Sequence, residues 1–175
     1  RVGSMNFDDR PPTETGRSGI ERRVEWGWAN YPLGMLSTLE VHHYPIPAGL
    51  DLLFWGNLPG GAGLSSSASI EVLTARVADD LFGMGLQGVE TALLAQRAEN
   101  DFVGMKCGIM DQFAVSMGRK GCAVLLNCAT LTHLYVPLYI TGYQIVIADT
   151  NRRQAAGRED YNLRRRQCEA ACEAI

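Results

Sequence analysis

The sequence predicts an α+β fold, in which short strands and amphipathic helices share a hydrophobic core. Hydrophobic residues make up 46% of the 175 residues, which is enough for a core and unlike a disordered composition. In several segments apolar side chains recur every three or four residues, as they do in helices that pack on a core. Other segments are short, continuous apolar runs, as in buried strands. Both patterns in one chain indicate a mixed fold.

The first third of the chain predicts a loop, a helix and a strand. Residues 8–25 are polar and contain glycine and proline, so we expect an exposed loop. Apolar residues follow at helical spacing over 28–42, and the prolines after this segment end the predicted helix. Residues 50–55 are apolar and aromatic, which favours a short buried strand.

The middle of the chain predicts three helices. The first begins within the serines at 65–67 and runs to about Phe82, since apolar residues recur at three and four positions until Gly83 stops it. The second is predicted over 87–102 and the third over 110–117.

The last third predicts strands and a final helix. Residues 122–126 and 134–136 are expected to form two strands joined by a turn, and 143–148 a further buried strand. A helix is predicted from about residue 160, with its apolar residues and two cysteines on one stripe.

Charge and composition exclude several functional classes. The net charge is −3, and the densest basic run, Arg164–Arg166, has acidic neighbours, which favours a solvated helix face over a nucleic-acid surface. Neither an apolar run of about 18 residues nor a signal-peptide core occurs in the sequence, so we expect a soluble cytoplasmic protein without a membrane partner. The five cysteines form no Cys-x-x-Cys pair, so we expect buried thiols rather than disulfides or a zinc site.

The run Pro59–Ala68 (Pro-Gly-Gly-Ala-Gly-Leu-Ser-Ser-Ser-Ala) carries the clearest chemical signal. It lies between the predicted strand 50–55 and a predicted helix. The N–H groups of a first helical turn and the helix dipole bind phosphate there, and glycines allow close approach of the backbone. No lysine follows the glycines, so the run is not a Gly-x-x-x-x-Gly-Lys loop. The alternative is a flexible turn with a serine N-cap.

The run resembles the second signature motif of the GHMP kinases. Four further segments are similar to family segments in order and spacing: Trp28–Tyr31, Ala98–Gly104, Cys107–Phe113 and Glu159–Glu169. The resemblance extends over residues 26–175. It implies that residues 1–138 form most of the family's N-terminal domain and that residues 139–175 begin a second domain.

Within the family, these segments resemble the members that phosphorylate galactose at its anomeric hydroxyl. The resemblance therefore implies galactose and ATP as substrates and Mg²⁺ as cofactor. It implies this set of ATP-binding residues: Trp28, Tyr31, Gly61, Gly63, Leu64, Ser65, Ser66 and Ser67. Two alternatives stay open. The sugar could be arabinose or N-acetylgalactosamine, or the protein could be a sensor that binds ATP and sugar without turnover.

The resemblance also implies roles for individual residues. Asp111 accepts the proton of the sugar hydroxyl or orients that hydroxyl, and Gly108 and Tyr161 contact the sugar. Glu99 and Ser67 are the implied Mg²⁺ ligands, which fits the preference of that ion for oxygen.

Spacing alone allows other readings of the same residues. Asp111 could cap a helix, Glu99 could be solvated, and Tyr161 could be a core aromatic. Trp28 and Tyr31 lie three apart on the predicted helix, so they are expected to face one way, toward either the core or adenine.

Two motifs of galactose-phosphorylating members do not occur in the 175 residues. One is an N-terminal arginine followed by Gly-Glu-His-Thr-Asp, and the other is a glycine-rich third motif. We therefore expect a central fragment of a longer enzyme. Because phosphoryl transfer depends on positioning and charge stabilisation, the fragment alone is expected to be weakly active or inactive.

Overall fold

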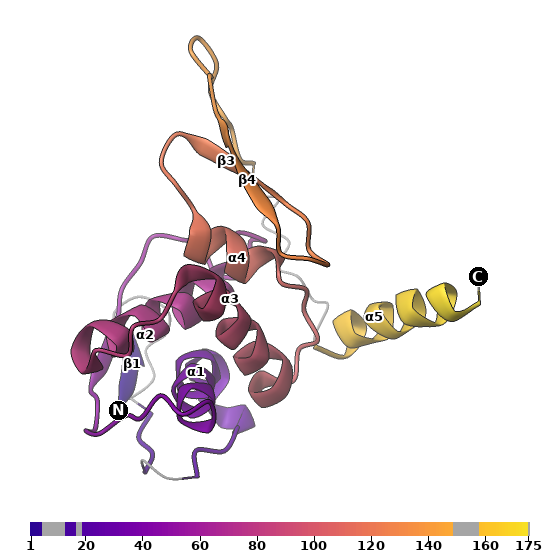
Figure 1. The fold of residues 1–175 in the computed structure, drawn as a ribbon. Helices are drawn as coiled ribbons and strands as arrows, with labels where there is room; N and C mark the ends of the chain where they lie inside the picture. The colour runs from indigo at the N-terminus through magenta and orange to yellow at the C-terminus, as the bar shows by residue number, and fades with distance from the viewer. Residues whose placement is uncertain (5–12, 17–18, 149–157, 175) are drawn as a thin grey trace.

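The computed structural model describes residues 1–4, 13–16, 19–148 and 158–174. Helices α1 to α4 form one body, with a β-hairpin standing above α4 and helix α5 projecting to one side (Figure 1). Helices and short strands together confirm the α+β prediction. Residues 5–12 and 17–18 lie outside the described residues, and they include residues 8–12 and 17–18 of the predicted N-terminal loop.

Helix α1 (Asn30–Val41) lies at the centre of the helical body and contacts α2 (Ser66–Phe82), α3 (Gly88–Arg97) and η2 (Ala98–Val103). It is preceded by a 3₁₀ helix, η1 (Val24–Ala29), so helical structure begins four residues earlier than predicted. Both the predicted helix over 65–82 and its stop are confirmed, because Gly83 adopts the left-handed conformation (φ 64°) at the end of α2.

The third predicted helix is α4 (Met110–Met117), and its bounds are the predicted ones at both ends. The second predicted helix, over 87–102, corresponds to α3 followed by η2. η2 is a π-helix that begins inside the predicted segment and extends it by one residue, Val103. A π-helix inserts an extra residue per turn and changes which side chains face the core.

Small side chains allow the central helices to approach closely. Met35 and Leu39 of α1 are fully buried among alanines of α2 and α3. A Cβ atom on Gly34 would lie 2.7 Å from the Cδ1 atom of Phe102, so the contact between α1 and η2 requires glycine at this position. The close packing fixes η2, and with it Glu99, against α1 and α3.

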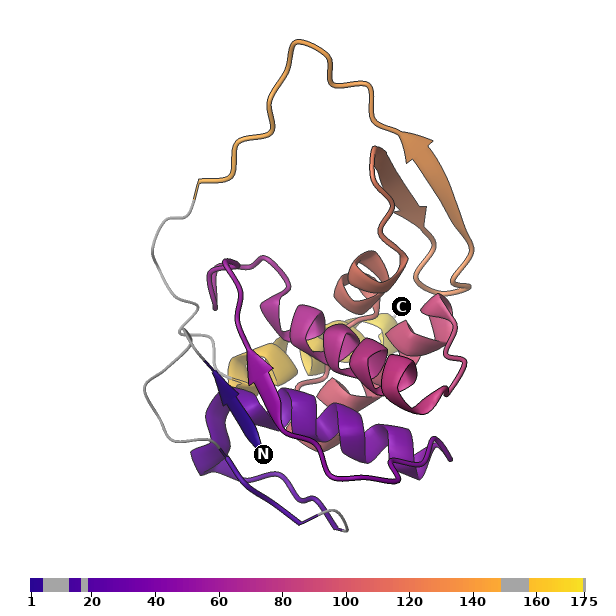
Figure 2. The same cartoon turned by 90° about the vertical axis from the view of Figure 1, so that its left-hand side faces the viewer.

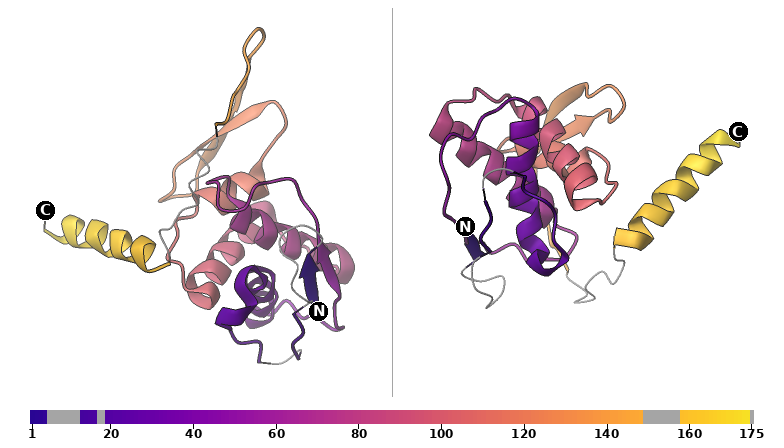
Figure 3. Two further views of the ribbon diagram at one scale, coloured as in Figure 1. Left: turned by 180° about the vertical axis from the view of Figure 1, so that it is seen from behind. Right: turned by 90° about the horizontal axis from the view of Figure 1, so that it is seen from below.

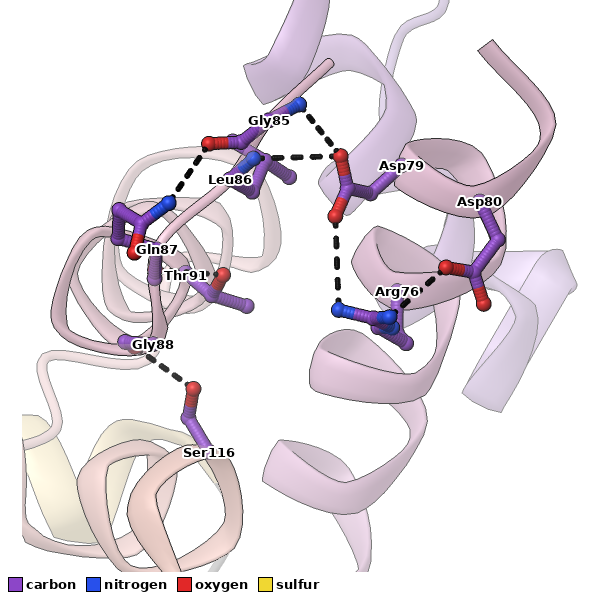
Figure 4. Close-up of polar contacts among 9 residues, drawn as sticks. All are labelled: Arg76, Asp79, Asp80, Gly85, Leu86, Gln87, Gly88, Thr91 and Ser116. Atoms are coloured by element: carbon purple, nitrogen blue, oxygen red, sulfur yellow. Dashed lines mark hydrogen bonds and ion pairs between the residues drawn. The ribbon is translucent and has the colours of Figure 1, made fainter. Parts of the chain in front are cut away.

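The turn from α2 to α3 is held by side-chain bonds (Figure 4). Asp79 Oδ1 accepts the backbone N–H of Gly85 at 2.7 Å and of Leu86 at 3.2 Å. On the other side of α3, Ser116 Oγ of α4 donates to the carbonyl oxygen of Gly88 at 2.6 Å. These bonds set the positions of α2, α3 and α4 relative to one another.

A two-stranded parallel sheet covers one side of the helices. β1 (Val2–Ser4) pairs with β2 (Leu52–Phe54), with Val2 opposite Leu52 (Figure 2). The strand predicted at 50–55 is confirmed in shorter form, whereas β1 was not predicted. Val2 and Phe54 are buried in a core cluster with Ala29 and Leu33.

The hairpin of β3 (Cys122–Leu126) and β4 (His133–Pro137) confirms the two predicted strands joined by a turn. It is attached to α4 by polar and aromatic contacts. The Tyr135 hydroxyl donates to the carbonyl oxygen of Met117 at 2.8 Å, and the His133 ring meets the Phe113 ring edge-on.

The prediction of a strand at 143–148 is wrong. These residues have no strand structure, and Tyr143, Ile145, Val146 and Ile147 are exposed. A strand needs a neighbour that pairs its backbone N–H and C=O groups. In the described part of the chain the sheets contain only the pairs β1–β2 and β3–β4, so this apolar segment has no strand beside it.

Helix α5 (Arg158–Glu173) confirms the predicted final helix and docks through its first turn. Asn162 Nδ2 donates to the carbonyl oxygen of Gly104 at 3.0 Å, and its Oδ1 accepts the N–H of Lys106 at 2.9 Å. The rest of α5 projects away from the other helices (Figure 3), so the stripe with Cys168 and Cys172 is exposed. No described helix is both long and apolar enough to cross a membrane.

Candidate active site

The predicted phosphate loop connects β2 to α2, as the sequence indicates. Gly61 and Gly63 have φ of 70° and 73°, which glycine adopts without a steric penalty. Ser65, the last residue before the helix, is also left-handed (φ 55°, ψ 36°), an uncommon conformation for serine. Ser65 makes no side-chain capping hydrogen bond, contrary to the serine N-cap alternative. The loop and the helix N-terminus thus leave backbone N–H groups available for an anion.

Two carboxylates meet beneath the first turns of α2. Ser67 and Glu71 lie four residues apart and therefore share one face of α2. Glu99 comes from the π-helix η2. Glu71 is 0% exposed and Glu99 is 3% exposed, so the reading of Glu99 as a solvated residue is wrong. Buried carboxyl groups need compensation by a proton, a hydrogen bond or a cation.

Gln112 of α4 supplies hydrogen bonds to both carboxyl groups. Its Nε2 atom lies 2.7 Å from Glu99 Oε2 and 3.4 Å from Glu71 Oε2. It also lies 3.6 Å from the Sγ atom of Cys107. Three elements and the loop before α4 therefore meet at one buried polar cluster, defined here by Glu71, Glu99, Cys107 and Gln112.

Burial raises the pKa of the Glu71 carboxyl far above its usual range, and the neighbouring negative charge of Glu99 adds to this rise. Burial also raises the pKa of Glu99, while a favourable interaction with the Ser67 hydroxyl opposes the rise. One oxygen of Glu71 is buried without a hydrogen-bond partner. Both shifts favour the protonated form of these carboxyl groups over the ionised form.

The oxygen donors of Glu99 and Ser67 suit Mg²⁺, which prefers carboxylate, hydroxyl and phosphate oxygens. The unpartnered oxygen of Glu71 and the uncompensated charge of the pair fit a cation nearby. Within the described residues, no group of three or more His, Cys, Asp and Glu side chains is arranged to hold a metal ion.

Asp111 lies in the first turn of α4, next to Gln112, and is half-buried. Its negative charge contributes to the raised pKa of Glu99, which places the two carboxyl groups in one neighbourhood. Gly108 precedes α4, is exposed, and has no atom within 4 Å of the position that a Cβ would occupy. Space is therefore open at the predicted sugar-contacting backbone.

The predicted aromatic pair does not share one environment. The Trp28 ring meets the Phe54 ring edge-on at 5.6 Å, within the core cluster around Val2. For Tyr31, burial and then the charges of Glu99 and Glu71 raise the pKa to about 12, so its hydroxyl lies within electrostatic reach of the buried polar cluster. The kink at Gly27 (φ 53°, ψ −124°) and the change from η1 to α1 at residue 30 alter the predicted helical spacing.

Tyr161 lies in the first turn of α5 and is 43% exposed, so its reading as a core aromatic is wrong for the described chain. Its neighbour Asn162 binds the backbone of Gly104 and Lys106. That loop leads directly into Gly108 and α4, so α5 begins at the segment that carries the predicted sugar contacts.

Sequence reasoning did not identify Glu71 and Gln112. One signal was present for Glu71: a charged residue lies on the same face of the amphipathic helix as Ala68, Ala75 and Ala78, which are buried. A charge on a buried helix face usually has a partner. Gln112 had no comparable signal, because a glutamine beside an exposed helix start is ordinary.

The prediction of buried thiols holds only in part. Cys107 and Cys122 are half-buried, whereas Cys128, Cys168 and Cys172 are exposed on the hairpin loop and on α5. The exposed cysteines occupy segments that the described core does not cover.

We expect Cys107 to resist alkylation. Burial, with the negative charge of Glu99, raises its pKa to about 12, and the thiolate is the reactive form. Iodoacetamide at about pH 8 should therefore modify Cys128 far faster than Cys107, as peptide mass spectrometry measures. Unfolding in urea should abolish the difference. Equal labelling rates in the folded protein would contradict the burial of this thiol.

The comparisons with known proteins agree with these features. The model of the GHMP kinases N terminal domain matches residues 30–119. The galactokinase of Clostridium beijerinckii is 45% identical over 99% of this chain and 45% of its own length. The galactokinase of Fusobacterium nucleatum is 50% identical over 100% of this chain and 45% of its own length.

A solved structure is also similar. The crystal structure of Lactococcus lactis galactokinase complexed with galactose matches with a TM-score of 0.75 and 35% sequence identity, over 96% of this chain and 46% of that chain. The chain spans less than half the length of the relatives it matches.

Proposed function

Because this chain belongs to the GHMP kinases, we propose that it carries the phosphate loop and the catalytic carboxylate of an enzyme that phosphorylates galactose at its anomeric hydroxyl with ATP. One observation supports the proposal most strongly. Ser67 of α2 and Asp111 of α4 both interact with the buried carboxyl group of Glu99 from η2, so three separate elements contribute to one neighbourhood. A phosphate loop, metal donors and a proton acceptor in one neighbourhood are the parts that phosphoryl transfer requires.

The phosphates of ATP bind at the N-terminus of α2 in this proposal. The backbone from Gly61 to Ser67 donates N–H groups to phosphate oxygens, with the left-handed Gly63 and Ser65 shaping the turn. Trp28 and Tyr31 are the proposed aromatic residues beside adenine. Glu99 and Ser67 would hold Mg²⁺, which would neutralise negative charge on the phosphates.

Asp111 acts on the sugar. Its carboxylate accepts the proton of the anomeric hydroxyl, or orients that hydroxyl, as the oxygen attacks the terminal phosphorus of ATP; the bond from that phosphorus to the bridging oxygen breaks, and ADP leaves. Gly108, whose surroundings are open, and Tyr161 of α5 are the proposed sugar contacts. We also propose that the chain divides near residue 138, just after β4, into an N-terminal domain and the start of a second domain.

A panel of sugars tests this proposal on the full-length protein. Coupled detection of ADP should show turnover with galactose that exceeds turnover with arabinose, N-acetylgalactosamine and glucose. Preference for another sugar would contradict galactose as the substrate. Binding of ATP and galactose without ADP release would instead identify a sensor.

The isolated 175-residue chain should show weak or no turnover in the same assay. Its sequence does not contain the arginine motif or the third glycine-rich motif of galactose-phosphorylating members. Phosphoryl transfer depends on positioning and charge stabilisation, to which both motifs are expected to contribute. Robust galactose-dependent ADP release from the chain alone would contradict this part of the proposal.

A further inference from the structure

We propose that Gln112 is a positioning residue, whose side-chain amide fixes the orientation of the Glu99 carboxylate toward the metal and nucleotide. The inference rests on the proposed function, because it assigns Glu99 to a metal site. It goes beyond that function because Gln112 is buried and is assigned no contact with a substrate. Its role is to orient Glu99, the proposed metal ligand in η2.

The position of Gln112 allows this role. Its side chain is 1% exposed and spans the space between α4, η2 and α2. The shortest of its contacts, 2.7 Å, joins Nε2 to Glu99 Oε2. The contacts to Glu71 Oε2 (3.4 Å) and Cys107 Sγ (3.6 Å) are longer, so Glu99 is the principal acceptor.

The chemistry of the neighbours fixes which way the amide points. A carboxyl oxygen accepts hydrogen bonds, so the NH₂ group of Gln112, rather than its oxygen, faces Oε2 of Glu99, with Nε2 at 2.7 Å. The Oε1 atom of Gln112 is left buried without a partner. An unpartnered buried acceptor costs free energy that an apolar side chain of the same size avoids. Filling the space between the helices therefore does not by itself explain why this position holds a glutamine rather than an apolar residue.

One hydrogen bond to a carboxylate constrains its rotation. Gln112 donates to Oε2 of Glu99, and the Ser67 hydroxyl interacts favourably with the same carboxylate, so two side chains constrain its orientation. Outer partners of metal-binding carboxylates act in this way, and their loss typically weakens metal binding 10- to 100-fold. Glu99 lies in a π-helix, where the extra residue per turn sets the direction of its side chain.

Gln112 also connects the metal donor to the proton acceptor. Asp111 and Gln112 are consecutive in the first turns of α4, so their side chains leave the helix about 100° apart. Gln112 points into the core toward Glu99, while Asp111 is half-buried near the open space at Gly108. The bond between Gln112 and Glu99 therefore joins η2 directly to the part of α4 that carries Asp111.

The test measures metal binding directly in the full-length protein. Gln112→Leu removes both N–H donors at similar volume, and Gln112→Glu keeps the shape without the amide. Gln87→Leu is the matched control, because Gln87 is an exposed glutamine that donates to the carbonyl oxygen of Gly85. The probe is Mn²⁺ in the presence of ADP, followed by electron paramagnetic resonance.

We expect the Gln112 variants to bind Mn²⁺ about 10- to 100-fold more weakly than the wild type, and Gln87→Leu to match the wild type. Turnover of the Gln112 variants should recover substantially at saturating Mg²⁺, which a general folding defect would not allow. Mn²⁺ affinity within twofold of the wild type would overturn the proposal. Failure of both Gln112 variants to fold would also overturn it, because Gln112 would then be a folding residue.

The two proposals fail in distinguishable ways. Mn²⁺ binding does not require turnover, so an inactive wild-type protein would contradict the proposed function and leave the comparison of Gln112 variants intact. An active wild type with unchanged Mn²⁺ binding in the variants would contradict only the role of Gln112.

Discussion

Replacing Asp111 by asparagine should lower galactose-dependent turnover of the full-length protein by about 100- to 10,000-fold, the usual contribution of a general base. Asparagine has the same shape as aspartate but cannot take up the hydroxyl proton. The phosphate loop and the metal donors lie on other elements, so ATP should still bind. Steady-state ADP release and ATP titration by calorimetry measure the two effects separately.

Asp80→Asn provides the matched control for Asp111→Asn. Asp80 is an exposed aspartate on α2 that pairs with Arg76 at 2.9 Å, so its replacement should leave turnover within twofold. Wild-type turnover in Asp111→Asn would contradict the catalytic role of Asp111. Loss of ATP binding together with turnover would instead indicate that Asp111 supports the structure of the site.

Replacing Glu71 by glutamine should stabilise the full-length protein in EDTA, and by more at high pH than at low pH. Burial and the charge of Glu99 raise the pKa of Glu71 above its ordinary value of 4.5. A group with a raised folded-state pKa contributes stability that is present below the unfolded pKa and is lost as pH rises toward the folded pKa. Glutamine is neutral at every pH and resembles the protonated glutamate, so the variant avoids this loss.

The size of this effect follows from linkage. Between the unfolded-state and the folded-state pKa of Glu71, each unit of pH changes the free energy of unfolding by at most about 1.4 kcal/mol. The stability of the variant relative to the wild type should therefore increase by on the order of 2 kcal/mol from about pH 5 to pH 8. Urea unfolding at the two pH values measures the difference. The exposed Glu21→Gln serves as control and should show no such trend. A pH-independent difference between Glu71→Gln and wild type would show that Glu71 is ionised in the folded protein.

Local signals determined much of the helical structure. The apolar spacing after Ser66, the left-handed Gly83 and the bounds of α4 could all be predicted, because caps and helical periodicity depend on residues a few positions apart. The hairpin of β3 and β4 could be predicted for the same reason, since its strands are close in sequence. The phosphate loop belongs with these features: glycines, serines and a following helix suffice to indicate an anion site.

Contacts between residues that are far apart in the sequence could be identified only in the tertiary structure. Val2 pairs with Leu52, so β1 becomes a strand only because β2 lies beside it. The stronger apolar pattern at 143–148 forms no strand, because no strand of the described residues lies beside it. Burial of Glu99 likewise depends on the packing of η2 against α1 and α3.

The candidate site divides in the same way. Asp111, Glu99 and Ser67 could be named from motifs that resemble those of a family, because motifs record residue types along the chain. The contact of Gln112 with Glu71 and Glu99 joins residues that are 41 and 13 positions apart. Spacing along a chain does not encode such a meeting; only the packing of α2, η2 and α4 brings these side chains into one buried polar cluster.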